Sequence, residues 1–172
     1  PSLAYKFLSD ISIRKKWDQR LESYHIIEES DNMVKQHNKL MKVKLPFYSQ
    51  RDQLIEQFMM KDYPRPGSHF TIAQSIEHPD YPADKNGFCR THATMIGYEF
   101  SPADNGTGTK VRYGYVNDLK GSLPGMLVQI MANKLMKKSI SDMTQYILDN
   151  QSEVNEIIEI INSDEEKRTN IS

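Results

Sequence analysis

Few residues of this chain have the types and spacing that catalytic or metal chemistry requires. The single Cys89 excludes an internal disulfide framework and a multi-cysteine metal site. Although it stands beside Arg90, a lone cysteine of this kind is more often a small buried hydrophobe than a nucleophile. No nucleophile elbow, P-loop or dinucleotide-binding glycine pattern occurs. The histidines show no metal-ligand spacing; they are His25, His37, His69, His78 and His92. We therefore expect no metal site and no enzyme activity.

The composition fits one domain of balanced charge. The 172 residues are enough to bury a single core. The 22 basic and 23 acidic residues leave a formal charge of -1, so net charge favours neither nucleic acid nor an anionic membrane as a partner. No run approaches the roughly 18 consecutive apolar residues of a membrane span, and the start, PSLAYKFLSD, lacks the apolar core of a signal peptide. We expect a cytoplasmic protein that binds no nucleic acid.

The predicted secondary structure changes along the chain from helices to strands. Leu3, Phe7, Leu8 and Ile11 have the spacing of one helical face, and Ser12 is a candidate cap for a second short helix. Short runs of β-forming residues, separated by turn clusters, then predict an antiparallel meander. The predicted strands are His25–Glu29, Met33–Val43, Gln53–Lys61, His69–Glu77, Arg90–Phe100 and Lys110–Asn117.

A long C-terminal helix is predicted after these strands. Pro124 suits a first helical turn, and apolar residues follow at helical spacing as far as Ile161. Packing on the chain's own sheet is favoured over a coiled coil, which needs a longer run of heptads. We expect a domain over residues 1–150, followed by a helical extension with a charged, frayed tail over residues 151–172.

The predicted fold class is therefore α+β, with short N-terminal helices, a curved antiparallel sheet and one long helix. Side chains either fill the space between sheet and helix or leave it hollow, and the pattern alone does not decide. Nine Met residues would adapt to variable apolar ligands, and Val111, Tyr113 and Tyr115 share one face of a strand. Both features also occur in ordinary cores.

Five segments, taken in order, carry a resemblance to a known family. They are RKKWD (14–18), LPFYSQRDQ (45–53), SIEHPDYP (75–82), CRTHATMIGYEFSP (89–102) and GTKVRYGYVNDLKGSLPGMLV (108–128). Together they resemble the START family of lipid-transfer domains, in particular its phosphatidylcholine-transfer members, from the first residues to about residue 150. Family members begin earlier, with a helix and opening strands, so we expect this domain to be incomplete at its N-terminus.

The resemblance implies a helix-grip fold, in which a curved antiparallel sheet grips the C-terminal helix around an apolar tunnel for one lipid. Such domains carry sterols, phosphatidylcholine, ceramide or related lipids between membranes. Exposing a lipid chain to water costs about 0.8 kcal/mol per CH₂, so a dry tunnel removes most of the barrier to desorption. We expect no cofactor besides the bound lipid, and a transient contact with a membrane surface.

Polar residues at the start of one strand are assigned by the same resemblance. Arg51 and Asp52 match the family's Arg-Asp pair, which implies structural pairing or contact with a lipid headgroup. Arg90 matches another recurrent arginine of the family. Gln57 stands where several members place an arginine inside the tunnel, and an uncharged amide there favours a neutral or zwitterionic lipid.

Apolar residues of the strands and of the last helix complete the predicted tunnel. Strand alternation places Ile55 and Met59 on the same side as Gln57. Tyr113 falls where relatives have a large aromatic lining residue, and Tyr115 shares its face. The helix contributes the lining candidates Leu127, Met131, Leu135 and Met143.

Two questions about partners stay open at this point. A domain that senses a lipid without moving it needs the same tunnel, so the sequence does not separate a carrier from a sensor. If the opening strands are missing, the sheet has an unpaired edge that another chain could pair with. We therefore expect a possible homodimer, through that edge or through the C-terminal helix.

Overall fold

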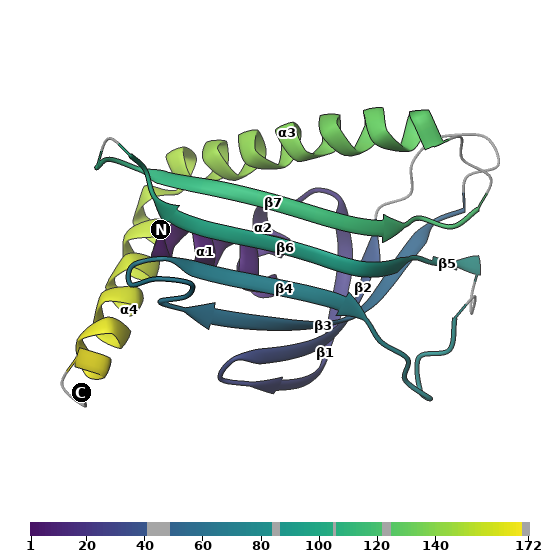
Figure 1. Cartoon of the computed structure of the whole chain (residues 1–172), viewed down its shortest axis with the longest axis horizontal. Helices are drawn as coiled ribbons and strands as arrows, with labels where there is room; N and C mark the ends of the chain where they lie inside the picture. The colour runs from purple at the N-terminus through teal and green to yellow at the C-terminus, as the bar shows by residue number, and fades with distance from the viewer. Residues whose placement is uncertain (41–48, 84–86, 105, 122–124, 170–172) are drawn as a thin grey trace.

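The computed structural model describes residues 1–40, 49–83, 87–104, 106–121 and 125–169. Two short helices come first, then the strands, then two longer helices (Figure 1). The elements are α1 Ser2–Ser9, α2 Ile11–Trp17, β1 Leu21–Ser30, β2 Met33–Leu40, β3 Arg51–Lys61, β4 His69–Ser75, β5 Cys89–Arg90, β6 His92–Pro102, β7 Thr109–Asp118, α3 Gly125–Asp149 and α4 Gln151–Thr169.

One seven-stranded sheet has the order β1-β2-β3-β4-β6-β7, with antiparallel neighbours throughout this path. The predicted α+β class and antiparallel meander are thereby confirmed. The predicted strand Arg90–Phe100 is wrong as one element, because β5 pairs in parallel with β3 whereas β6 pairs with β4. The break falls at Thr91, whose backbone N–H donates to the carbonyl of Asp52 at 3.0 Å. The end of the predicted strand Met33–Val43 lies outside the described residues.

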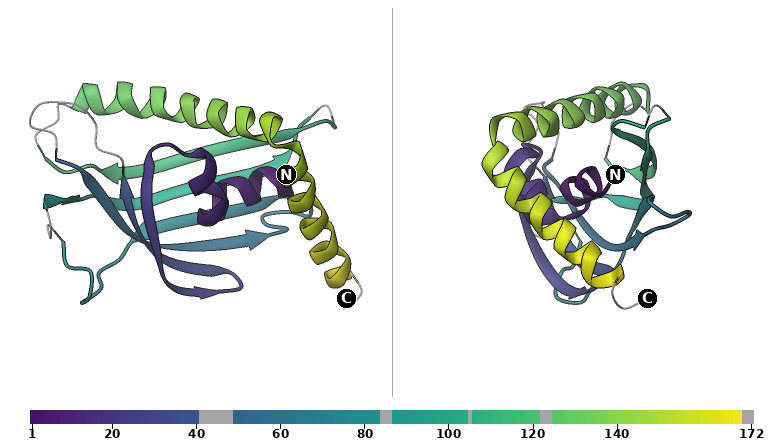
Figure 2. Two further views of the ribbon diagram at one scale, coloured as in Figure 1. Left: turned by 180° about the vertical axis from the view of Figure 1, so that it is seen from behind. Right: turned by 90° about the vertical axis from the view of Figure 1, so that its left-hand side faces the viewer.

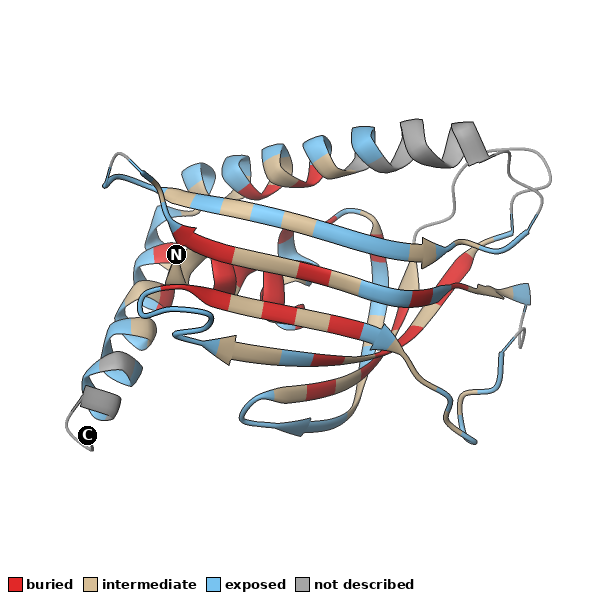
Figure 3. Cartoon of the chain, viewed as in Figure 1, coloured by how far each residue is buried: buried red, intermediate tan, exposed pale blue. Residues whose placement is uncertain are grey.

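The helices cover the concave side of this sheet. Figure 2 shows α1 and α2 inside the curve of the sheet, α3 along its open side and α4 across one end. Buried residues from both pairs of helices meet in one core, in which Phe7 and Phe100 are fully buried. Trp17 donates from its indole N–H to the carbonyl of Phe7 at 3.2 Å, so α1 and α2 are fixed to each other. The result is the predicted helix-grip arrangement, with helices held by a curved sheet (Figure 3).

The two N-terminal helices share one capping residue. Asp10 follows the end of α1, and its Oδ1 accepts hydrogen bonds from the backbone N–H groups of Ser12 at 2.9 Å and Ile13 at 3.4 Å. A carboxylate in this position satisfies N–H groups that a helix start leaves free. The prediction that Ser12 caps the second helix is therefore wrong, because α2 already begins at Ile11.

The predicted single C-terminal helix is also wrong, because the chain divides it at Asn150 into α3 and α4. The carbonyl of Tyr146 accepts both the backbone N–H of Asn150 at 3.1 Å and its side-chain amide at 2.9 Å. Asparagine competes in this way with the regular helical bonding pattern. Val154 and Ile157 of α4 are then buried in the core with α1.

Candidate functional site

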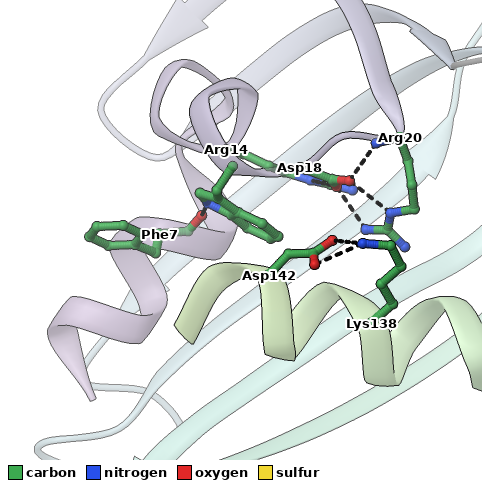
Figure 4. Close-up of polar contacts among 7 residues, drawn as sticks. Phe7, Arg14, Asp18, Arg20, Lys138 and Asp142 are labelled. Atoms are coloured by element: carbon green, nitrogen blue, oxygen red, sulfur yellow. Dashed lines mark hydrogen bonds and ion pairs between the residues drawn. The ribbon is translucent and has the colours of Figure 1, made fainter. Parts of the chain in front are cut away.

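Three charged residues lie on the concave side of the sheet, where α2 ends and β1 begins. Asp18 is 2% exposed, and its Oδ2 accepts a hydrogen bond from Arg14 Nε at 2.9 Å. Arg20 donates to the same carboxylate from Nε and Nη2, both at 2.7 Å, and from its backbone N–H at 3.0 Å. Figure 4 shows these contacts beside α3. We call these residues the Arg14–Asp18–Arg20 cluster. Its two guanidinium groups and one carboxylate give it a net charge of +1.

The protonation states of this cluster are fixed by its own contacts. Burial alone would raise the pKa of Asp18, but the hydrogen bonds and charges of Arg20 and Arg14 outweigh it and hold that pKa well below its usual range. Burial also disfavours the charged form of Arg20, yet its contacts with Asp18 raise the pKa of the guanidinium overall. The cluster is therefore ionised at neutral pH, with cationic groups directed into the space beneath the sheet.

An aromatic wall faces this cluster from β6 and β7. Tyr98 and Tyr113 are cross-strand neighbours with ring centroids 4.7 Å apart, and Tyr113 stacks on Tyr115 at 5.3 Å. Burial raises the pKa of both Tyr98 and Tyr113, so the phenols are neutral. Both rings are close enough to Arg20 to interact with its charge. Tyr115, at 37% exposure, is the outermost ring of the wall.

The predicted lining residues of β3 occupy one face, as strand alternation requires. Ile55 and Gln57 are buried, and the Gln57 side chain donates from Nε2 to the carbonyl of Ser9 in α1 at 3.0 Å. Met59 is partly buried against the core and lines a cavity of about 790 Å³ between α1, the β1–β2 hairpin and α4. All three side chains lie on the face of the sheet that α1 and α2 cover. Their contact with a lipid remains a prediction.

The predicted residues of the last helix are only partly described. Met143 is 7% exposed and lies in the core cluster with Phe7 and Trp17, so packing within the protein accounts for its burial. The side chains of Leu127, Met131 and Leu135 lie outside the described part of the structure.

Arg51 and Asp52 make different contacts, although they are adjacent on β3. Arg51 donates to the carbonyl of Lys120 at 3.0 Å, to that of Leu119 at 3.3 Å and to that of Ser49, so it holds the corner after β7. Asp52 is bound by the guanidinium of Arg90 through two hydrogen bonds of 2.9 Å and by His37 Nε2 at 2.8 Å. Both residues thus make contacts within the protein, and a headgroup contact of either remains a prediction.

Arg90 is thus directed away from the tyrosine wall. Asp52 alternates along β3 with the inward-facing residues, so the pair lies on the outer face of the sheet, where Arg90 also donates to the carbonyl of Tyr81 at 3.2 Å. Burial raises the pKa of Asp52, but the contacts with Arg90 and His37 lower it overall. The structure places Arg90 with Asp52 and Tyr81, not with Tyr113.

Buried polar atoms on the concave side mark further positions for a ligand or ordered water. Gln36 and Asn38 face inward from β2 and are 1% and 2% exposed. Gln36 Oε1 and Asn38 Oδ1 have no hydrogen-bond partner within the described residues. Such atoms are rare in folded proteins because leaving them unpaired costs about 1–3 kcal/mol. They offer acceptors to a bound hydroxyl, amide or water.

Arg14, Asp18 and Arg20 were not among the predicted site residues, although RKKWD is one of the segments that carry the resemblance. The spacing of an arginine four residues before an aspartate on a helix was a signal for the ion pair. The sequence could not show that this ion pair lies on the concave side, because its position depends on how α2 docks against the sheet. Among the residues that the structure describes, no group of three or more His, Cys, Asp or Glu side chains could hold a metal ion.

Comparisons with known proteins agree with this geometry. A family model described as START domain matches residues 1–153. The human StAR-related lipid transfer protein 5 superimposes with a TM-score of 0.72 at 20% identity, over 86% of this chain and 70% of that one. Human STARD10 gives a TM-score of 0.74 at 23% identity, over 90% of this chain and 60% of that one.

A bacterial structure shares the fold as well. The STAR-related lipid transfer protein from Xanthomonas axonopodis, a fragment of residues 25–204, gives a TM-score of 0.62 at 14% identity, over 84% of this chain and 77% of that one. No match was found among curated proteins. This chain spans only about 60% of STARD10, so the activity of that whole protein does not transfer to it directly. With the family model matching most of its length, the chain belongs to the START domain family.

Proposed function

We propose that the concave side of the sheet binds one phospholipid with a zwitterionic headgroup, and that the protein transfers it between membranes. The observation that carries the proposal is the Arg14–Asp18–Arg20 cluster, in which two half-buried, ionised arginines surround the buried Asp18 and leave one excess positive charge. START domains bind and transfer lipids, which supports the general activity. The cluster and the tyrosine wall support the particular headgroup.

A phosphate group suits the cluster for two reasons. A guanidinium binds phosphate oxygens through paired, charge-assisted hydrogen bonds, and Arg14 uses only Nε toward Asp18. The one excess positive charge of the cluster matches the single negative charge of a phosphodiester, so the phosphate itself would be paired where it binds. A headgroup with a further negative group, such as a carboxylate, would need a cation besides this cluster to pair with it.

The tyrosine wall suits the cationic part of the same headgroup. Tyr98 and Tyr113 pack on neighbouring rings, so Tyr115 at the end of the row is the ring that would offer its face to a ligand. That face carries negative charge density, and a quaternary ammonium group binds such a face within about 6 Å. The phosphate would lie on Arg14 and Arg20 while the ammonium group lies on Tyr115. This arrangement favours a phosphatidylcholine-like lipid over a sterol, which has neither charge.

The predicted lining residues would shelter the lipid's chains. Tyr115, Ile55 and Met59 face inward from the strands. Leu127, Met131, Leu135 and Met143 are proposed to contribute the same kind of surface from α3. Gln57, which donates to α1, and the free acceptors of β2 would serve polar groups near the glycerol.

A vesicle-to-vesicle transfer assay tests the proposal. Fluorescent phosphatidylcholine, phosphatidylserine and sterol probes are compared, and phosphatidylcholine should transfer fastest. Arg14→Gln should lower phosphatidylcholine transfer at least about tenfold, because a charge-assisted contact is lost. Arg112→Gln is the matched control, since Arg112 pairs with Glu99 on the outer face, and should leave transfer unchanged. Saturable binding without faster transfer would instead identify a lipid sensor.

Membrane contact, cytoplasmic location and self-association belong to the same proposal. No helix in the described part of the chain is long and apolar enough to cross a membrane. Transfer would therefore require the protein to bind a membrane surface transiently and release it. We also propose the predicted homodimer, through a sheet edge or through the C-terminal helix; the edge strands are β1 and β7. Flotation with vesicles would test the membrane contact, and sedimentation would test the homodimer.

A further inference from the structure

A second cavity lies at the end of the sheet that α4 crosses (Figure 2). It has a volume of about 790 Å³ and lies between α1, the β1–β2 hairpin and α4, and we call it the α4 cavity. Ser2, Tyr5, Lys6 and Ser9 line it, and their spacing places them on one face of α1. Phe7, on the opposite face, packs in the core. The volume is in the range of small-molecule sites.

Aliphatic side chains form part of the wall of the α4 cavity. Ile26 and Val34 come from the hairpin, and Val34 is 4% exposed. Ile160 and Ile161 come from α4, and Ile160 is 57% exposed. Contact with a hydrocarbon chain would remove this apolar surface from water, which is favourable. Among the described residues assigned to the proposed lipid site, only Met59 also lines this cavity.

Three carboxylates lie around the same cavity without partners. Glu29 and Asp31 belong to the hairpin, and Asp164 belongs to α4. Their carboxylate groups make no hydrogen bond or ion pair with any residue that the structure describes. Glu29 is the cross-strand neighbour of the buried Val34, so it lies on the concave face of the sheet, where apolar residues are usual.

The charge of the α4 cavity is negative. Its described lining residues include two lysines and four carboxylates, which leave a net charge of −2; they are Lys6, Lys61, Asp10, Glu29, Asp31 and Asp164. Lys6 and Asp10 neutralise each other, since they lie 3.0 Å apart. A negative rim beside an aliphatic wall is complementary to a cation that carries a hydrocarbon chain.

A buried hydroxyl in the same cavity also has no partner. Ser9 lines the cavity and is 6% exposed, and its Oγ has no hydrogen-bond partner among the residues that the structure describes. Its backbone carbonyl, in contrast, accepts a hydrogen bond from Gln57. Buried hydroxyl groups are rarely left unpaired, because they lose their contacts with water. The free Oγ can accept a hydrogen bond from a ligand.

We propose that the α4 cavity binds a single-chain lipid amine. Its ammonium group donates hydrogen bonds to acceptors from three elements, which are the hairpin carboxylates Glu29 and Asp31, Asp164 of α4 and Ser9 Oγ of α1. Its hydrocarbon chain lies against the aliphatic wall. A primary ammonium group suits this set because it has three donors and no acceptor. The site is separate from the proposed phospholipid site, so either proposal can fail without the other.

Titration calorimetry with decylamine, below the concentration at which it forms micelles, tests the proposal. A ligand of this size should bind with a Kd of about 100 µM. Decyltrimethylammonium has the same charge and the same chain but no N–H donor. It should therefore bind at least about tenfold more weakly, because the carboxylates and Ser9 Oγ would receive no hydrogen bond.

Three variants identify the site. Asp164→Asn should raise the Kd for decylamine about threefold, since it removes one exposed charge. Ser9→Ala should raise it about fivefold and leave the urea midpoint unchanged or higher, because the hydroxyl is unpaired in the free protein. Glu159→Gln is the control: it removes the same charge from an exposed position of α4 that does not line the cavity, and it should leave the Kd unchanged.

Four results would overturn the proposal. The first is no binding of decylamine at 1 mM. The second is equal affinity for decyltrimethylammonium, which would show that no hydrogen-bonded amine site exists. The third is an unchanged Kd in Asp164→Asn, which would place the ligand elsewhere. The fourth is displacement of fluorescent phosphatidylcholine by decylamine, which would place the amine in the phospholipid site.

Discussion

Replacing Asp18 by asparagine should destabilise the protein by removing the carboxylate that holds two arginines. Asp18 accepts four hydrogen bonds from Arg14 and Arg20, and its side chain is 2% exposed. Breaking a buried pair by removing one partner costs about 3–5 kcal/mol. Arg14 and Arg20 are 27% and 31% exposed, so water can solvate them in part. We therefore expect a loss of about 2–3 kcal/mol for Asp18→Asn at pH 7.

Urea unfolding at two pH values tests this number and its cause. With a slope of about 2 kcal/mol per M, the midpoint should fall by about 1–1.5 M at pH 7. Because the pKa of Asp18 is lower in the folded state, its contribution is complete above the ordinary value of 3.8 and is lost as pH falls below it. The difference between the two proteins should therefore be smaller at pH 3.

A matched control and a ligand measurement make the prediction sharper. Asp142→Asn removes an ion pair with Lys138 on the surface of α3, which should cost about 0.5 kcal/mol or less. Asp18→Asn also changes the charge of the cluster from +1 to +2, so affinity should shift from phosphatidylcholine toward phosphatidylserine. A loss below about 1 kcal/mol at pH 7, or an equal loss at pH 3, would refute the assignment of the ion cluster.

Three further substitutions test other parts of the fold, each by urea unfolding. Asp10→Ala should cost about 1 kcal/mol because α2 loses its cap, whereas Asp10→Asn should restore most of it. Trp17→Phe should cost about 1–2 kcal/mol by leaving the Phe7 carbonyl unpaired; no loss would show that water replaces the indole. Gly121→Ala should cost more than about 1 kcal/mol, since φ is +82° and the added Cβ would lie 2.9 Å from Arg51 Nη2. Gly106→Ala is the control: its φ is +74° and its surroundings are open, so it measures the cost of the backbone strain without the clash with Arg51.

Local pattern was sufficient for most of the sheet. Period-two alternation predicted that Ile55, Gln57 and Met59 share a face, and the contact of Gln57 with α1 shows that this face is the concave one. Turn clusters correctly separated the long strands. These features depend on neighbours in sequence, which is why they could be predicted.

Features that depend on distant contacts could not be predicted in the same way. The apolar spacing continues through Asn150, so it gave no sign that α4 changes direction to pack on α1. The Arg14–Asp18–Arg20 cluster required α2 to dock on the concave side. Thr91 interrupts the β-forming segment Arg90–Phe100 because its backbone N–H donates a hydrogen bond to the carbonyl of Asp52, 39 residues away.

The hydrogen bonds of Arg51 to the corner after β7 constrain how α3 could move. Arg51 fixes the carbonyls of Leu119 and Lys120, a few residues before α3 begins, so this end of α3 stays tied to β3. With 25 residues, α3 is about 37 Å long, and a swing of about 10° about that anchor would displace its far end by about 6 Å. The far end is held through Glu153, which accepts the Tyr146 hydroxyl and pairs with Lys16 at the surface. Any swing of α3 about its Arg51 anchor would therefore have to break the Glu153 contacts, and salt weakens the surface ion pair among them.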